Sequence, residues 1–321
     1  MGSKADLVNG NVSNPSRPLL VVCDFDHTLI NVNSDLVLFH ELPYGQSLIP
    51  SFVSLRKEQG LGWTQTMQAQ LAALAEQDGY SKGDMLECLG RVKMDPVLLA
   101  ALEKLHKNQA PKVKFVIASD ANTIFIDEIL RANGVEKDTF SKIYTNPGMW
   151  AEHDVLRVEP YQSIDAPHEC LRACPPNMCK SSILRRAVKE LKLEDATDLR
   201  AVYVGDGGND FCPALELSET DLVLVREGFA LQKLIDKAAI EASTDPESPA
   251  ESDKQSDTKS VKAQIKLWNT QEELGQLLVQ LVGGDAPVPV SSPTQDQVET
   301  AVQQLEHDLA AKATIGDGPH L

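Results

Sequence analysis

The sequence predicts an α/β fold in which a doubly wound parallel sheet carries an inserted α-helical cap. Three segments support this fold class, because each passes from an apolar, β-branched run through small or acidic residues into a helical pattern. They are 19–26 (LLVVCDFD), 114–130 (KFVIASDANTIFIDEIL) and 200–218 (RAVYVGDGGNDFCPALELS). Continuous Val and Ile runs without polar alternation indicate strands covered on both faces, as in a parallel sheet between two helical layers.

A helical module is expected between the first two strands. This stretch lacks a strand pattern, and its last helix is opened by a capping box of Ser81 and Asp84. Asp95 as N-cap and Pro96 at the first helical position mark the return to the sheet. An insertion of this kind can act as a lid. The expected boundaries are 19–31 and 94–242 for the core and 32–93 for the cap, with cap helices around 34–42, 47–59 and 64–76.

The two ends of the chain differ from this core. Residues 1–18 and the acidic linker 243–260 are poor in apolar residues and are expected to be disordered, whereas 261–283 predicts a strand and a helix that complete the core. Within 284–321, one helical face carries Val298, Val302, Leu305 and Leu309. Two interpretations of this amphipathic helix stay open: a fraying terminal helix, or a helix that binds an unidentified partner.

Composition limits the classes of partner. The 321 residues, 42% of them hydrophobic, can bury one sizeable core and a second, smaller one. A formal net charge of −17 argues against nucleic acid or an anionic membrane as partner. No stretch reaches the roughly 18 to 20 apolar residues that cross a bilayer, and the N-terminal sequence has no signal-peptide core. Six cysteines in a chain this long are not typical of a secreted disulfide framework, so a cytoplasmic protein is expected.

Polar residues end all three apolar runs. Because ligands bind beyond the carboxyl ends of the strands in an open parallel sheet, these residues are expected to face one crevice. They are Asp24 and Asp26, Ser119 and Asp120, and Asp206 and Asp210. A lone DxD is typical of a turn or a helix cap. Converging carboxylates, however, raise one another's pKa unless a cation lies among them, and hard oxygen ligands favour Mg²⁺.

The four sequences DFDHTLI, VIAS, NMCKSS and GDGGND resemble, in order, the four motifs of the haloacid dehalogenase superfamily of phosphotransferases. The resemblance extends to about Leu234 and implies a Rossmann-type core. It also implies that Asp24 is the nucleophile that forms an aspartyl-phosphate, and that Asp26 protonates the leaving alcohol and then activates water. An isolated lysine is ordinarily solvated, but Lys180 opens the helix SSILRRAVKEL, and the resemblance assigns it, with Ser119, to the phosphoryl oxygens.

The same resemblance implies a Mg²⁺ site. Asp206 would bind the ion beside Asp24 and the backbone carbonyl of Asp26, and Asp210 would orient the metal-bound waters. Glycines at 205, 207 and 208 allow the backbone to approach metal and substrate, and Gly207 is expected to contact the phosphate.

Longer stretches narrow the family. DFDHTLINVNSD, SDANTIFIDEILRANG, HECLRACPPNMCKS and VYVGDGGNDFCPAL resemble the phosphoethanolamine/phosphocholine phosphatases and their relatives, the pyridoxal phosphate phosphatases and plant pyrophosphatase-like proteins. Asp35 and Asp120 match family positions that hold the substrate's cationic amine. Each also stands where a helix is expected to begin, so a helix-cap role remains the alternative.

The string HECLRACPPNMC leaves a second choice open. Three thiolates and an imidazole can close a tetrahedral Zn²⁺ site, here His168, Cys170, Cys174 and Cys179. The alternative is a set of reduced cysteines that pack the loop positioning Lys180. Cys23 and Cys212 lie in apolar strings and are expected to be buried core residues, and His27 is expected to orient its loop.

The predicted function is a Mg²⁺-dependent phosphatase that hydrolyses a small phosphomonoester, with phosphoethanolamine and phosphocholine favoured. Pyridoxal phosphate and pyrophosphate are the alternative substrates. An inactive scaffold whose tail binds a partner is the alternative class, and retention of both motif-one aspartates, Lys180 and the final acidic pair argues against it.

Overall fold

The computed structural model describes residues 18–76, 80–108, 112–170, 172, 174–193, 199–244 and 260–283. The predicted terminal helix at 298–309, nearly all of the linker at 243–260 and all of the N-terminal segment except Pro18 lie outside these residues. Within the described part of the chain, no helix combines the length and the apolar character needed to cross a membrane.

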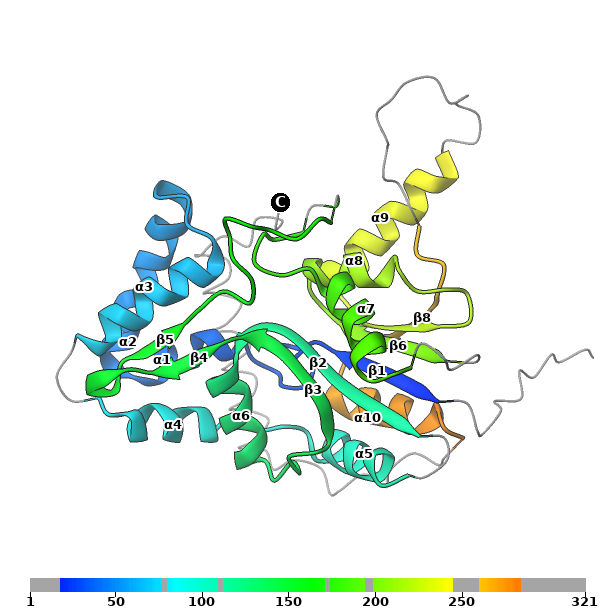
Figure 1. Ribbon diagram of the computed structural model, residues 1–321, viewed down its shortest axis with the longest axis horizontal. Helices are drawn as coiled ribbons and strands as arrows, with labels where there is room; N and C mark the ends of the chain where they lie inside the picture. Colours follow the sequence, from blue (N-terminus) through cyan, green and yellow to red (C-terminus); the bar gives the residue numbers. More distant parts are fainter. Residues whose placement is uncertain are drawn as a thin grey trace, which may run out of the picture.

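A six-stranded parallel sheet forms the centre of the molecule (Figure 1). Its order is β3-β2-β1-β6-β7-β8, so the chain winds outward from β1 in both directions and confirms the predicted doubly wound α/β fold. Cys23, the last residue of β1, pairs with Ile117 of β2 and Val204 of β6, so β1 and β6 end at nearly the same level while β2 continues to Asn122. The strands are β1 (Leu19–Cys23), β2 (Val113–Asn122), β3 (Phe140–Asn146), β6 (Arg200–Gly205), β7 (Leu222–Arg226) and β8 (Gln264–Trp268).

Helices cover both faces of the sheet. On one face lie α5 (Pro96–His106), α6 (Thr123–Ala132) and α10 (Gln271–Gln280), and on the other lie α7 (Lys180–Glu190), α8 (Phe211–Ala214) and α9 (Ala230–Thr244). All five residues of β1 are buried, because the central strand contributes side chains to both apolar layers. The strand and helix expected in 261–283 are β8 and α10, and α10 packs against α5.

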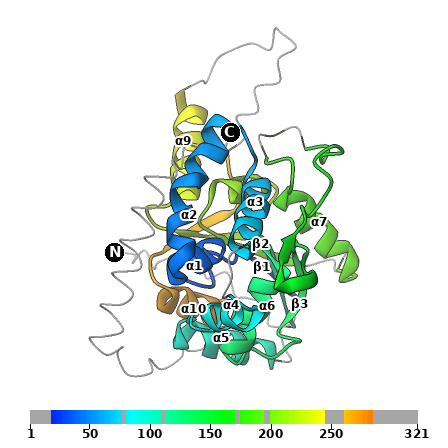
Figure 2. The ribbon, with the colours of Figure 1, turned by 90° about the vertical axis from the view of Figure 1, so that its left-hand side faces the viewer.

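The cap segment between β1 and α5 is helical (Figure 2, which looks onto α1–α3). Its last helix begins with the predicted capping box, in which the Ser81 and Asp84 side chains each accept from the other residue's backbone N–H. Asp95 also caps α5 as predicted, with Pro96 at its first position. The elements are α1 (Ser34–Glu41), α2 (Pro43–Val53), a π-helical turn (Ser54–Glu58), α3 (Trp63–Ala75) and α4 (Lys82–Gly90).

A two-stranded antiparallel hairpin of β4 (Gly148–Trp150) and β5 (Leu156–Val158) lies beside the cap. Its residues were expected in the core, yet β5 contacts α3, and Gln68 Nε2 donates to the Val158 carbonyl at 2.5 Å. The cap helices are therefore contacted by a segment that follows β3 in the sequence. Three-residue strands are too short to leave a periodic pattern in the sequence.

Candidate active site

Asp24 follows the last residue of β1 and is held by the sheet itself. Its backbone N–H donates to the Val204 carbonyl at 2.9 Å, which continues the ladder between β1 and β6 by one residue. Its Oδ1 accepts from the Phe25 N–H at 2.7 Å. The side chain is thus fixed at the carboxyl edge of the central strand, with Oδ2 directed toward Lys180.

Lys180 is the first residue of α7, and its side chain is only 1% exposed. Its Nζ lies 2.8 Å from Asp24 Oδ2 and 2.7 Å from Asp210 Oδ1. Burial opposes the charged ammonium, but Asp210 and Asp24 outweigh burial and raise the pKa of Lys180 above its ordinary value. The interpretation of Lys180 as a solvated surface lysine is therefore wrong.

Asp210 is fully buried and accepts four hydrogen bonds. Its Oδ1 accepts from Lys180 Nζ at 2.7 Å and from the Tyr203 hydroxyl at 2.6 Å. Its Oδ2 accepts from the backbone N–H groups of Asp206 at 3.1 Å and Gly207 at 2.9 Å. The Asp210 side chain packs so close to the backbone of residue 205 that glycine is required there, because a Cβ would lie 2.5 Å from Asp210 Cγ.

Three buried carboxylates form the candidate metal centre. One oxygen from each of Asp24, Asp206 and Asp210 lies within 4.8 Å of the others. Burial raises the pKa of Asp24 well above its ordinary value; Lys180 opposes this, and Asp210 and Asp206 add to it. A cluster of like charges with one ammonium for compensation fits an added divalent cation, and an all-oxygen donor set fits Mg²⁺. The Asp26 carboxylate is not in this group, so only its backbone carbonyl remains expected as a ligand.

Asp26 is placed on the cap side of the same loop. Its Oδ1 accepts from the Ser34 N–H, the first residue of α1, at 3.0 Å. Burial raises the pKa of Asp26 to about 7, against the lowering effect of the Ser34 hydrogen bond. A carboxyl group with this pKa can both give and take a proton near neutral pH, as an acid–base catalyst must.

Ser119 and Asp120 lie near the end of β2, where the pairing with β3 shifts register between Ala118 and Asn122. Such an irregularity turns side chains that a regular strand would direct elsewhere. Ser119 is fully buried, and its Oγ accepts from the Ala121 N–H at 3.2 Å. Asp120 does not cap a helix, because β2 continues to Asn122, which itself caps α6 by accepting from Phe125 N–H at 3.1 Å.

Asp35 likewise does not cap α1, since Asn33 has that role and accepts from the Asp35 N–H at 3.0 Å. The carboxylate of Asp35 is buried and accepts from the Trp63 indole Nε1–H at 2.6 Å. Burial raises its pKa well above the ordinary value, with a further contribution from Asp26 and opposition from the Trp63 bond. Both helix-cap interpretations are therefore wrong.

Several supporting residues were not found from the sequence. Arg226, at the end of β7, donates to the His27 carbonyl and to Asn31 Oδ1, and its guanidinium lies over the Trp268 ring. Thr28 Oγ1 donates to Asp206 Oδ1 at 3.1 Å. The sequence offers one signal for Arg226: a fourth apolar run, LVLVR at 222–226, ends in this arginine, which is buried in the structure. His27 adopts a positive φ of 53° in this loop.

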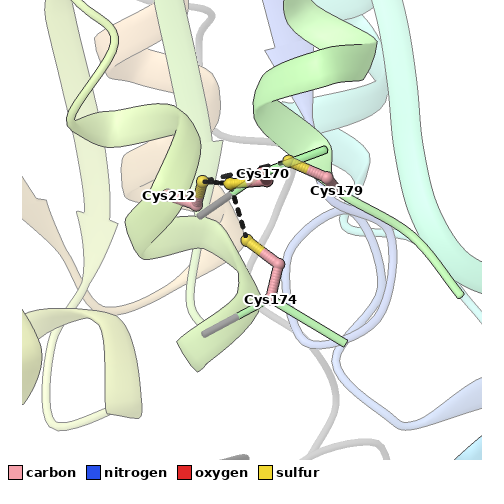
Figure 3. Close-up of side chains that lie close together, drawn as sticks. All are labelled: Cys170, Cys174, Cys179 and Cys212. Carbon is pink, nitrogen blue, oxygen red and sulfur yellow. Dashed lines mark hydrogen bonds between the residues drawn. The ribbon is translucent and has the colours of Figure 1, made fainter. Parts of the chain in front are cut away.

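The predicted His–Cys₃ set is not brought together. His168 engages backbone groups: Nδ1 accepts from the Cys170 N–H at 3.3 Å, and Nε2 donates to the Pro175 carbonyl at 2.9 Å. Cys212, predicted only as a buried core residue, is buried and joins Cys170, Cys174 and Cys179 instead (Figure 3). Proximity in the sequence therefore did not indicate that Cys212 lies beside these three cysteines.

Comparison with known proteins places this site in a family. Residues 19–282 match the family described as "Putative Phosphatase". A thiamine phosphate phosphatase-like protein of Arabidopsis thaliana is 34% identical over 266 residues, covering 82% of this chain and 95% of that protein. A pyridoxal phosphate phosphatase of Bos taurus is 33% identical, covering 68% and 86%, and a phosphoethanolamine/phosphocholine phosphatase of Gallus gallus is 34% identical, covering 68% and 78%.

The resemblance to phosphatases drawn from the motifs is thereby confirmed, as is the expectation of an enzyme. The chain belongs to this phosphatase family, and it is a phosphoric monoester hydrolase.

Proposed function

We propose that the protein is a Mg²⁺-dependent phosphatase of small phosphomonoesters that carry a cationic amine, with phosphoethanolamine and phosphocholine as the preferred class. The observation that supports the substrate class is the buried Asp35 carboxylate, which is held by Trp63 of the cap and lies close enough to Asp26 and Asp120 for their charges to raise its pKa. The sequence resemblance points to Asp35 and Asp120 for this role.

In the proposed reaction, Asp24 attacks the phosphorus atom through a carboxylate oxygen. The new bond joins this oxygen to phosphorus as the ester P–O bond breaks, and the leaving alcohol takes a proton from Asp26. A water molecule then gives its proton to Asp26 and attacks phosphorus, which releases phosphate and restores both aspartates. A pKa near 7 allows Asp26 to serve in both steps.

Lys180 and Ser119 support the transferring phosphoryl group in this proposal. The ammonium of Lys180 lies 2.8 Å from the nucleophile, so it can offset the repulsion between an anionic carboxylate and an anionic ester. Mg²⁺, held by Asp24, Asp206 and the backbone carbonyl of Asp26, would supply further positive charge. Asp210 would act mainly by holding Lys180 and the loop at Gly207 in place.

The amine of the substrate would contact one carboxylate from the cap and one from the core. Asp35 lies in α1 and Asp120 in β2, so a cation between them would join cap and core. The elevated pKa of Asp35 would fall when a cation binds, because an opposite charge favours the ionised carboxylate. Pyrophosphate carries no cation and gains nothing from this arrangement.

The test compares phosphoethanolamine with propyl phosphate, which has nearly the same shape but no charge on the amine position. Phosphate release is measured with and without Mg²⁺, and Asp24→Asn protein serves as the blank. Asp35→Asn is expected to raise KM for phosphoethanolamine by about 10- to 100-fold, since a hydrogen bond to a charged group contributes about 1.5–3 kcal/mol. Propyl phosphate should be affected far less.

Equal effects on the two esters would refute the amine site. A preference for pyridoxal phosphate, thiamine phosphate or pyrophosphate in the same assay would retain the aspartyl-phosphate mechanism and reject the proposed substrate class. Activity that is unchanged by chelation of Mg²⁺ would reject the proposed cofactor.

A further inference from the structure

Four cysteines from three separate segments converge beside the active site (Figure 3). Cys170 and Cys174 lie in the loop that follows β5, Cys179 is the N-cap of α7, and Cys212 lies in α8. Their sulfur atoms all lie within 4.8 Å of one another. The Sγ–Sγ distances are 3.7 Å between Cys170 and Cys174, 3.6 Å between Cys170 and Cys212, and 3.9 Å between Cys179 and Cys212.

These separations match the edge of a thiolate tetrahedron around zinc. With Zn–S bonds of about 2.3 Å, the ligand sulfurs of a tetrahedral site lie about 3.8 Å apart. A disulfide requires sulfurs at about 2.05 Å, and all six cysteines of the chain are free thiols here. A set of reduced thiols in a core would need no common separation, because each packs as an independent small apolar group.

The surroundings suit a thiolate cluster. Four thiolates around Zn²⁺ leave two net negative charges, and Arg172 Nη1 lies 3.5 Å from Cys212 Sγ. The Ser181 hydroxyl lies 2.7 Å from the same sulfur and can donate to it. Such contacts orient ligands and offset their charge at structural zinc sites. His168 holds the loop from outside, through its bonds to backbone groups at Cys170 and Pro175.

We propose that Cys170, Cys174, Cys179 and Cys212 bind one structural Zn²⁺ ion in a closed four-thiolate site. The soft sulfur ligands distinguish this site from the carboxylate centre, which favours Mg²⁺. No open coordination position remains for substrate, so the ion has no direct part in the chemistry.

The position of the site gives it a consequence for catalysis. Cys179 immediately precedes Lys180, and Cys212 follows Asp210 by two residues. Each partner of the Lys180–Asp210 ion pair, 2.7 Å long, therefore lies within two residues of a cysteine that would bind the ion, Cys179 or Cys212. Zinc would fix the start of α7 against α8 and so keep Lys180 within reach of Asp24.

The experiment measures metal content and ligand type in full-length protein purified under reducing conditions from zinc-supplemented cells. Mass spectrometry for metals should give one zinc per chain, and zinc X-ray absorption should show four sulfur neighbours at about 2.3 Å. Cys174→Ala should lose the zinc. The control is Cys88→Ala, which changes a buried cysteine in the cap and should keep the zinc, as should His168→Ala.

A second readout separates this proposal from the proposed phosphatase mechanism. Replacing zinc by Co²⁺ should give the intense visible bands of tetrahedral cobalt with thiolate charge transfer, whether or not any phosphate ester is hydrolysed. Protein without zinc, zinc bound by oxygen or nitrogen atoms, iron in its place, or a native Cys170–Cys174 disulfide would each overturn the assignment.

Discussion

Replacement of Gly205 by alanine is expected to displace the Asp210 carboxylate. An added Cβ would lie 2.5 Å from both Cγ and Oδ2 of Asp210 and 2.9 Å from its Cβ, closer than real Cβ atoms approach other atoms. Asp210 cannot give way freely, because its two oxygens accept from Lys180, Tyr203 and two backbone N–H groups. The side chain must move away from at least one of these donors.

The expected change in the free energy of unfolding combines two destabilising effects and one stabilising effect. Overpacking of a rigid interior costs about 1–3 kcal/mol. Loss of one hydrogen bond to a buried carboxylate adds about 1.5–3 kcal/mol. Alanine is favoured over glycine within a strand by about 0.5–1 kcal/mol. The free energy of unfolding of Gly205→Ala should therefore fall by about 2–5 kcal/mol. Phosphatase activity should fall with it, because the carboxylate that contacts Lys180 and the Gly207 N–H is displaced.

Urea denaturation and phosphate release are the assays. The matched control is Gly208→Ala, where an added Cβ would meet only Leu234 Cδ1 at 3.7 Å, an ordinary contact. This control should keep its free energy of unfolding close to that of the parent protein. If Gly205→Ala and Gly208→Ala had the same free energy of unfolding, the close contact between the Asp210 side chain and the backbone at Gly205 would be refuted.

Two further predictions concern the loop after β1. Because burial raises the pKa of Asp26 to about 7 from its ordinary value near 3.8, its contribution to stability is present below about pH 4 and is lost as the pH rises through 7. Urea unfolding in EDTA should therefore show stability falling with pH more steeply for the parent protein than for Asp26→Asn, and equal slopes would contradict the assigned environment. Arg226→Met should lower kcat about tenfold or more, since it removes donors to the His27 carbonyl and Asn31. Arg185→Met, at an exposed arginine, should leave kcat unchanged, and a similar loss in both variants would show that Arg226 has no specific positioning role.

The strands and the carboxylates at their ends could be predicted from sequence, because both depend on local pattern. An unbroken apolar run followed by acidic residues identifies β1, β2 and β6 and places Asp24 and Asp206 at one edge of the sheet. The capping residues Ser81 and Asp95 were found for the same reason, since each acts within its own helix.

Features that depend on distant pairing were missed or misassigned. Nothing adjacent to Cys212 suggests that it meets Cys170, because the two are joined only when α8 packs beside α7. The sequence leaves a helix-cap role open for Asp120 because it does not show that β2 continues to Asn122. Arg226 contacts a loop almost 200 residues away, so its role depends on the whole sheet.

The strand that leads into Asp24, β1, precedes the other strands of the sheet along the chain. Leu19 of β1 pairs with Val113 on one side and with Arg200 on the other, and neither partner exists until much more of the chain has been made. Closing such long loops is entropically costly and makes folding slow, since non-local contacts must form before they can stabilise one another. A chain that ends before β6 lacks Asp206 and Asp210, so activity is expected to return during refolding only after β6 has docked against β1.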